Sequence, residues 1–240
     1  MSDSLRLSKR LSSQINCSRS DAIKYIESGY VTVDGAVIEE PGCHVHAEQQ
    51  IMLLPNAKIE ATDAVTILLH KPAGYDIETN PEAAMLLITP ENHTQDDRSP
   101  NRFIKKHLKD LTLTEPLGSQ TSGLVVLTQD WRIARKLIDD AKKIEQEYIV
   151  EVSGELLAGG LEQLNLGVMI KDKQTPAKVS WQSENKLRFA FKGIPRGHIP
   201  KMCSQVGLTV LAMKRIRIGR VPMATLQIGQ WRYLLAHEQF

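Results

Sequence analysis

Helical and extended hydrophobic patterns follow one another at the start of the chain. Leu7, Leu11 and Ile15 recur at every fourth position, which predicts a short helix with one apolar face. Ser18 is followed three residues later by Asp21, a pair typical of a helix N-terminus, and apolar residues then recur at helical spacing. Two consecutive short helices are therefore expected.

A small antiparallel sheet is predicted after these helices. Gly29 is expected to end the second helix, and residues 30–33 alternate as a strand does. The dipeptide at 34–35 is Asp-Gly, which strongly favours a two-residue hairpin turn into residues 36–38. With a last strand over 50–54, the beginning of the chain reads as a compact unit of helices and strands.

The rest of the chain predicts a larger sheet with few helices. A polar stretch over 55–63 has weak periodicity and is expected to be a linker. Apolar or alternating runs then predict strands, separated by irregular or helical segments. The expected elements are a strand at 65–69, an irregular stretch at 79–100, a basic helix at 102–108, a strand at 124–127, a helix at 132–138 and a strand at 146–152.

Composition adds a broad class and a compartment. The 240 residues are 42% apolar and 24% charged, as in ordinary soluble proteins, and allow one large domain or a medium domain with a small one attached. Cys17, Cys43 and Cys203 are isolated, which suits a reducing compartment. Since no apolar run approaches the ~20 residues that span a bilayer, we expect a cytoplasmic protein.

Positive charge is concentrated in two regions, although the net charge is only +2. Residues 192–232 hold eight Lys and Arg and no Asp or Glu, and residues 6–24 hold five against the single Asp21. Separated basic regions of this kind fit a polyanionic partner such as nucleic acid. The alternative is that acidic residues elsewhere in the chain cover them.

The stretch 116–130 has the form of an active-site loop that lacks reactive groups. Its polar turn leads into the apolar strand, an arrangement that often presents a reactive side chain. The turn contains no carboxylate, thiol or imidazole, and offers only the hydroxyl groups of Ser119, Thr121 and Ser122. No adjacent His is present to activate them.

A metal site is the other candidate for chemistry. In the run at 43–46, His44 and His46 would share one face of a strand, where two imidazoles could bind zinc. No further pair of ligands at metal-site spacing follows. We expect no metal and no cofactor.

Several motifs resemble those of RNA pseudouridine synthases of the RsuA/RluF branch. Thr-Ser-Gly-Leu at 121–124, followed by Leu-Thr at 127–128, is similar to their central motif, and Lys-Pro-Ala-Gly at 71–74 to their first. In those enzymes the central motif is preceded by Arg-Leu-Asp, whose Asp is the nucleophile. Here the three positions are Pro116, Leu117 and Gly118.

The resemblance assigns three further positions. Tyr148 stands where the family has the tyrosine that packs against the target uracil, and Gln146 replaces a Lys of the same motif. Pro200 stands where the family has the arginine that pairs with the catalytic Asp. Both members of the catalytic ion pair are therefore absent. Their joint loss is physically coherent, because an arginine buried without its carboxylate would be destabilising.

Residues 1–54 resemble the S4 RNA-binding domain. The resemblance rests on Leu-Ser-Lys-Arg-Leu at 7–11, Ser-Arg-Ser-Asp-Ala at 18–22 and Gly-Tyr-Val-Thr-Val-Asp-Gly at 29–35. A helix N-terminus favours an anion, which agrees with phosphate contacts there. The expected contacts to RNA in the small domain and in the C-terminal region are Lys9, Arg10, Ser18, Arg19, Lys24, Lys201, Lys214, Arg215 and Arg217.

Fold and function follow as expectations from these resemblances. The fold implied is α+β: an S4 domain at 1–54, a linker at 55–63, and at 64–240 a synthase-like domain with a mixed, largely antiparallel sheet crossed by the cleft. We expect a monomeric, catalytically degenerate protein that binds structured RNA, most plausibly ribosomal RNA. The alternative is an active synthase that uses a carboxylate from elsewhere, within hydrogen-bond reach of Tyr148. The candidates are Asp76, Asp96 and Asp97.

Overall fold

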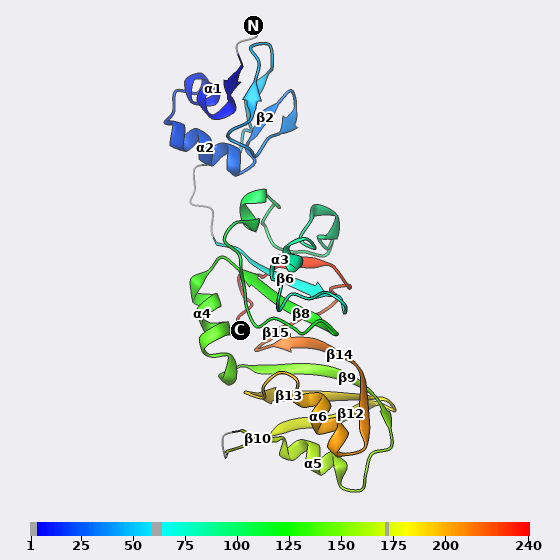
Figure 1. Cartoon of the computed structure of the whole chain (residues 1–240). Coiled ribbons are helices and arrows are strands. Elements are labelled where there is room, and N and C mark those ends of the chain that lie inside the picture. The colour runs from blue at the N-terminus through cyan, green and yellow to red at the C-terminus, as the bar shows by residue number, and fades with distance from the viewer. Residues whose placement is uncertain (1–3, 59–63, 171–172) are drawn as a thin grey trace. The chain divides into compact units, whose positions relative to one another are not determined.

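The computed structural model describes residues 4–58, 64–170 and 173–240, and divides into two compact units (Figure 1). Unit 1 comprises the chain up to Ala64 together with Arg102–Asp110, and unit 2 comprises Val65–Asn101 and Leu111–Phe240. Most of the linker expected at 55–63 lies outside the described residues. Each unit is built around its own sheet.

Unit 1 begins with the two expected helices. Helix α1 spans Leu7–Gln14 and α2 spans Arg19–Glu27. The backbone N–H of Asp21 donates to the Ser18 hydroxyl at 3.0 Å, so Ser18 is the N-cap that the sequence predicts. The apolar faces of both helices meet in one core, formed by Leu7, Leu11, Ala22, Ile26, Val31, Val33, Val45 and Ile51.

The strands of unit 1 also follow the prediction. A three-stranded sheet has the order β3 (Ala36–Val37), β2 (Val31–Val33) and β5 (Ile51–Leu53). Asp34 and Gly35 both have positive φ, +52° and +84°, as a two-residue turn of the mirror-image type requires. A separate pair joins β1 (Leu5–Arg6) to β4 (His44–Val45).

The segment Arg102–Asp110 belongs to unit 1, whereas the sequence analysis placed it in the larger domain. It contains a short 3₁₀ helix, η2 (Lys105–Leu108), in place of the expected longer helix. Two polar contacts hold the segment: Lys109 pairs with Glu27 at 2.9 Å, and the Lys105 N–H donates to Glu39 at 2.6 Å. Sequence periodicity does not predict such contacts, because they join residues far apart in the chain.

Unit 2 is built on a nine-stranded sheet (Figure 1). The strand order is β12-β13-β9-β14-β8-β6-β16, with β15 paired to β14 and β7 to β8. All the pairings in this sheet are antiparallel except β8 with β14, so the expected mixed, largely antiparallel sheet is confirmed. The bounds are β6 Thr66–Lys71, β7 Thr112–Leu113, β8 Thr121–Thr128, β9 Glu145–Gly154, β12 Ala177–Ser183, β13 Lys186–Lys192, β14 Leu208–Ile218, β15 Val221–Pro222 and β16 Trp231–Tyr233, beside a separate hairpin of β10 Val168–Ile170 and β11 Lys173–Thr175.

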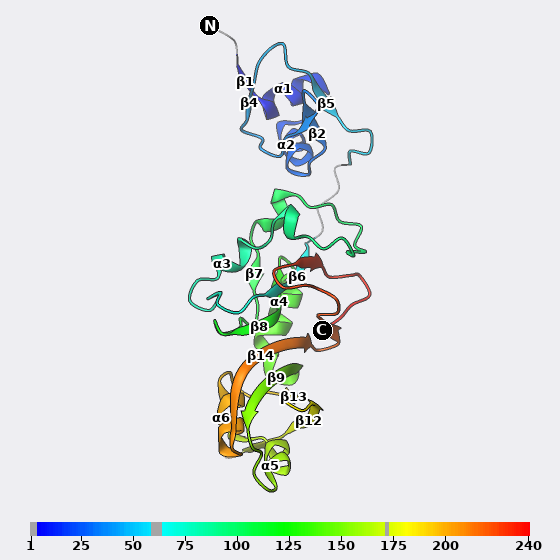
Figure 2. The ribbon, with the colours of Figure 1, turned by 90° about the vertical axis from the view of Figure 1, so that its right-hand side faces the viewer.

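Helices cover parts of this sheet, and β9 and β14 run side by side through it (Figures 1 and 2). Leu137 of α4 packs into a core with Leu68, Leu124 and Ile218, as the expected helix at 132–138 requires. No described helix is long and apolar enough to cross a membrane. The helical elements are α3 Glu82–Met85, η1 Pro90–Asn92, α4 Trp131–Asp139, η3 Ala141–Lys143, α5 Gly160–Leu166 and α6 His198–Gln205.

The end of β6 anchors the loop that precedes β8. Lys71 is fully buried, and its ammonium group donates to the carbonyl oxygens of Pro72 and Tyr75 at 2.8 Å and of Ser119 at 3.1 Å. The Gly74 N–H donates to the same Ser119 oxygen at 2.8 Å. Burial lowers the pKa of Lys71 to about 8. The family-like first motif thus holds the central loop in place.

Gly123 lies where β8 and β14 approach most closely. Its φ is +116°, and a Cβ at this position would lie 2.2 Å from the carbonyl oxygen of Arg215 and 2.5 Å from its nitrogen. The parallel pairing aligns these same two residues. Only glycine allows the two strands to meet in this way.

We predict that Gly123→Ala lowers the free energy of unfolding by about 2–5 kcal/mol, through backbone overlap and an unfavourable φ. Gly118→Ala is the matched control, because the nearest atom to its Cβ would be Glu78 Oε2 at 3.9 Å. The control should change stability by less than about 0.5 kcal/mol. Urea denaturation of both variants makes the comparison, and equal losses would contradict the assigned close approach.

Lys71 predicts a pH dependence of stability. Its folded pKa of about 8 lies below the ordinary 10.5, so between these pH values the unfolded chain binds more protons. Its contribution to the unfolding free energy therefore rises with pH across this window. Between pH 8 and 10.5 the free energy of unfolding of the wild type should rise by about 3 kcal/mol relative to that of Lys71→Met. Denaturation of both proteins at several pH values measures the difference, and a constant difference would refute it.

Candidate active site

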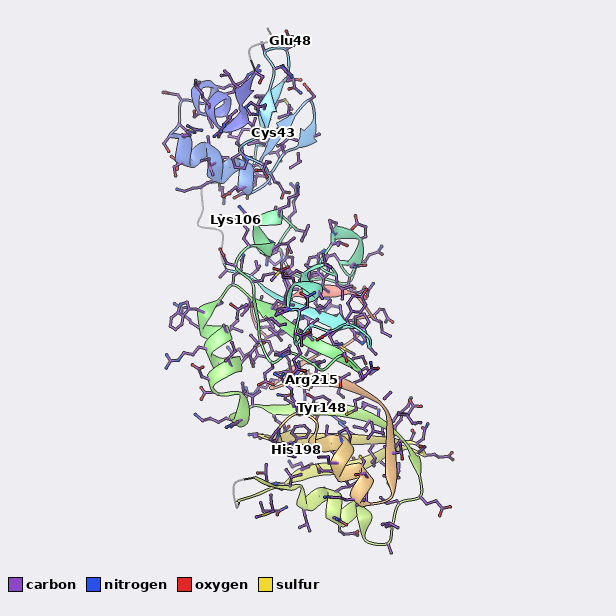
Figure 3. The ribbon with its side chains drawn as sticks, in the orientation of Figure 1. Cys43, Glu48, Lys106, Tyr148, His198 and Arg215 are labelled. Atoms are coloured by element: carbon purple, nitrogen blue, oxygen red, sulfur yellow. The ribbon has the colours of Figure 1, made fainter. Side chains whose placement is uncertain are left out.

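A pocket of about 470 Å³ lies where β8, β9 and β14 meet, at the middle of the sheet. It brings together Gly118, Tyr148 and Pro200, which come from three distant parts of the sequence. Figure 3 shows Tyr148 close to Arg215 in this region. The three positions that the family resemblance singles out therefore share one cavity.

The walls of the pocket are largely apolar. Tyr148 is 8% exposed, and its ring lies parallel to that of Phe191 with 5.6 Å between centroids. A flat, largely apolar group could pack against such walls. The other apolar lining residues are Leu117, Ile194, Pro195, Ile199, Pro200 and Met213.

Gln146 is the centre of a polar network at one side of the pocket. Its amide oxygen accepts from the Tyr148 hydroxyl at 2.9 Å and from the Arg215 guanidinium at 3.2 Å. Its amide nitrogen donates to Glu115 at 3.3 Å. Arg215 also donates to the backbone oxygens of Glu115 and Leu124. The network fixes the tyrosine hydroxyl, which donates to an amide oxygen and not to a carboxylate.

Glu115 has an unusual backbone conformation. Its φ of +28° is uncommon for a residue with a side chain and is a source of local strain. The strain is offset by the two contacts it allows, one from the carboxylate to Gln146 and one from the carbonyl oxygen to Arg215. Glu115 thus brings a carboxylate to the pocket lining directly before the altered motif.

A second carboxylate lies beside the empty space at Gly118. Glu78 Oε2 is the nearest atom to a Cβ built on Gly118, at 3.9 Å. The same side chain forms an ion pair with Arg196 at 2.9 Å, and both residues line the pocket. Each is about half exposed, with 46% for Arg196 and 49% for Glu78. The pocket therefore contains a carboxylate–guanidinium pair built from positions other than 118 and 200.

Pro200 stands in the first turn of α6, which follows Gly197 at a φ of +74°. A proline is tolerated there, because the first N–H groups of a helix have no intrahelical acceptor. The local sequence thus favours the helix while placing no charge at this position. Pro200 lines the pocket and supplies only apolar surface.

The three aspartates considered from the sequence lie elsewhere. Asp76 accepts hydrogen bonds from Glu78 and Thr79 in its own turn, and does not line the pocket. Asp96 and Asp97 line a different groove. Asp97 is held by the His93 ring at 2.7 Å and the Tyr233 N–H at 2.9 Å. The expectation for these residues is wrong, and the pocket carboxylates are Glu78 and Glu115.

Little in the sequence pattern identifies Glu78 and Glu115 as residues of the pocket. Glu78 lies just before an irregular stretch without periodicity, so nothing indicated its direction. Glu115 adjoins the altered motif, and a search for carboxylates within a few residues of Gly118 would have found it. Its approach to Gln146 depends on the positive φ, which sequence pattern does not predict for a glutamate.

Two of the basic residues expected at an RNA surface make polar contacts within the protein. Arg215 is 1% exposed and belongs to the network beneath the pocket. Arg217 pairs with Glu145 at 2.5 Å and Glu147 at 2.7 Å, and the hydrogen bond from Arg217 is the main cause of the lowered pKa of Glu147. The expectation for Arg215 is wrong, because carbonyl groups and Gln146 hold it in the interior, whereas a contact of the 23% exposed Arg217 with RNA stays a prediction. Lys201 is exposed and Lys214 is half-buried.

The basic residues of unit 1 fall into two groups. Lys9 and Arg19 are exposed, with Arg19 in the first turn of α2. Arg10, in contrast, donates to the backbone oxygens of residues 46, 47 and 49. Ser18 caps α2, and Lys24 pairs with Asp21 at 3.3 Å while its side chain remains 50% exposed. Lys9 and Arg19 are therefore the cations of these helices that are most accessible to a ligand.

Metal ligands do not gather in the described parts of the chain. No group of three or more His, Cys, Asp or Glu side chains is arranged there to hold an ion. His44 is exposed on β4, next to the buried Val45.

Comparison with known proteins agrees with the motifs. The RNA pseudouridylate synthase family matches residues 65–199. Similar proteins include ribosomal small subunit pseudouridine synthase A of Vibrio cholerae, 24% identical over 98% of this chain and 97% of its own. The dual-specificity RNA pseudouridine synthase RluF of Escherichia coli is 29% identical over 98% of this chain and 77% of its own.

A third relative and one solved structure extend the comparison. Ribosomal large subunit pseudouridine synthase B of Bacillus subtilis is 26% identical over 97% of this chain and 93% of its own. A crystal structure of a pseudouridylate synthase aligns over 96% of both chains, with a TM-score of 0.59 and 19% identity, and has the same fold. The chain belongs to the RNA pseudouridine synthase family, in its RsuA/RluF branch.

Proposed function

We propose that this protein binds structured RNA, most plausibly ribosomal RNA, and no longer isomerises uridine. The observation that carries the proposal is Gly118, which leaves the nucleophile position without a side chain inside an otherwise formed pocket. The relatives named for ribosomal subunits support the choice of RNA. We further propose a cytoplasmic monomer, in keeping with three free cysteines.

The missing side chain bears directly on the chemistry. Forming pseudouridine requires cleavage of the glycosidic C–N bond and its replacement by a C–C bond, on a base flipped out of its stack. A carboxylate performs this step as a nucleophile or by abstracting a proton from the sugar. Glycine provides neither group, and Pro200 provides no cation to hold a carboxylate charged. The retained Tyr148 and Phe191 can pack against a base without reacting with it.

Unit 1 supports RNA binding through its S4-like succession of two helices and a hairpin. Arg19 stands exposed in the first turn of α2, where helix N–H groups and the macrodipole favour an anion. Lys9 is exposed on α1, which packs against α2 in the same core. We propose these two side chains as the principal phosphate contacts of unit 1.

A second function, an active synthase, is favoured by one observation. Glu78 places a carboxylate oxygen within 3.9 Å of the Cβ position at residue 118, and Arg196 holds that carboxylate in an ion pair. In this case Glu78 would replace the missing Asp, and Arg196 the missing Arg.

One experiment separates the two functions. Ribosomal RNA is isolated from a strain that lacks this gene, incubated with the purified protein and analysed for pseudouridine. We predict that the wild type forms no pseudouridine while binding the same RNA with a salt-dependent affinity. Pseudouridine formation by the wild type would overturn the proposal. Glu78→Gln, with Glu82→Gln as control, would then show whether Glu78 is the catalytic group.

Glu78 affects any attempt to introduce synthase activity by placing an Asp at position 118. An Asp at position 118 would stand next to this carboxylate, and two adjacent like charges raise the pKa of one of them. We therefore predict that Gly118→Asp with Pro200→Arg gains more activity when Glu78→Gln is added. The same pseudouridine assay compares the wild type, the double variant and the triple variant. Equal activity with and without Glu78→Gln would contradict this reading of the pocket.

A further inference from the structure

A basic hollow of about 410 Å³ lies on unit 2, apart from the pocket at Gly118. It is enclosed by α4 and η3 on one side, by the adjoining ends of β9 and β13, and by the turn between β14 and β15. Five of its lining residues are basic and two are acidic. They are Lys136, Lys143, Lys192, Arg217 and Arg220, against Asp140 and Glu145.

Ion pairs within the hollow leave part of the positive charge uncompensated. Lys143 pairs with Asp140 at 2.7 Å, and Arg217 pairs with Glu145 at 2.5 Å and with Glu147. Three further cations form no ion pair with a described Asp or Glu side chain, although one of them, Lys136, interacts with Asp140 at longer range. These are Lys136, Lys192 and Arg220, all of them exposed.

The cations stand on a rigid frame. Lys192 ends β13 and is aligned with Glu145 of β9, so the paired strands fix its backbone. Arg217 donates to the backbone oxygen of Gly219, which holds the turn that bears Arg220. Because the supporting backbone is fixed, an anion would meet cations already gathered in one place.

The hollow and the pocket at Gly118 border the same intermediate cavity. Ile144 lines the hollow and also a neighbouring cavity of about 300 Å³. That cavity shares Glu115, Gln146, Phe191 and Arg196 with the pocket at Gly118. The pocket and the hollow thus lie on the same unit, with one cavity between them.

An exposed aromatic ring stands at the start of α4, outside the lining of the hollow. Trp131 is 65% exposed at the start of the helix, and the Arg132 guanidinium lies 5.8 Å from its ring centre. Exposed aromatic rings next to basic side chains are typical of surfaces on which nucleic acid bases stack. Lys136 lies farther along the same helix, toward the hollow.

We propose that this basic hollow binds backbone phosphates of the RNA that the protein recognises. The proposal rests on the proposed RNA-binding function and adds a contact surface, Lys136, Lys192 and Arg220, on unit 2. It replaces the buried Arg215 as a phosphate contact of the C-terminal region. Phosphate contacts fix position and affinity without reading sequence, so their loss should weaken all RNA sequences alike.

The test is fluorescence anisotropy with two labelled RNAs, a hairpin from ribosomal RNA and a hairpin of unrelated sequence, over a series of salt concentrations. The variant is Lys192→Glu with Arg220→Glu. Its control is Lys178→Glu with Arg98→Glu, which changes the charge equally at one exposed Lys and one exposed Arg of unit 2 outside the hollow. Circular dichroism checks that both variants fold.

We expect the hollow variant to lose at least tenfold in affinity for both RNAs, and the slope of log K against log salt to fall by about two. The control variant should retain most of the affinity for both RNAs and most of the salt dependence. If the two variants lose affinity equally, the hollow is not a specific contact and the inference is wrong. If the wild type binds neither RNA, the proposed function itself fails, which is a distinguishable result.

Discussion

The parallel pairing of β8 with β14 is the contact on which the pocket depends. It joins the strand that follows the altered loop to the strand that contributes Arg215 and Met213, and it is possible because position 123 has no side chain. The Arg215 guanidinium then reaches back to Leu124 and Glu115, across the same junction. Two backbones held this closely leave the pocket little freedom to change shape.

This constraint is independent of the reactive groups. Lys71 and Arg215 donate to backbone oxygens around the loop, and Gly123 contributes by having no side chain at the strand junction. The sheet therefore needs no side chain at position 118 for its support. The residues that hold this scaffold are distinct from position 118.

Sequence predicted the parts of the structure that local pattern determines. The Ser18 cap, the Asp34-Gly35 turn and the β8 strand lie where periodicity and turn chemistry predict them. The three positions that the motif resemblance identifies, Gly118, Tyr148 and Pro200, line one cavity. The prediction failed where a side chain's partner lies far away in the chain. Arg215 looked like a surface cation, and only the arrangement of β14 beside β8 shows that backbone oxygens hold it in the interior.

The return of Arg102–Asp110 to unit 1 has a consequence for the topology of the chain. The backbone passes between the units after Ala64, again after Asn101 and once more after Asp110, so three covalent connections join them. Cleavage after Ala64 would leave residues 1–64 held only by their non-covalent contacts with Arg102–Asp110, such as the ion pair of Glu27 with Lys109. A fragment ending at residue 64 also lacks the segment whose Ile104, 5% exposed, is buried in the intact protein. Unit 1 is therefore built from two stretches of chain, and its exchange between relatives would require both stretches to move together.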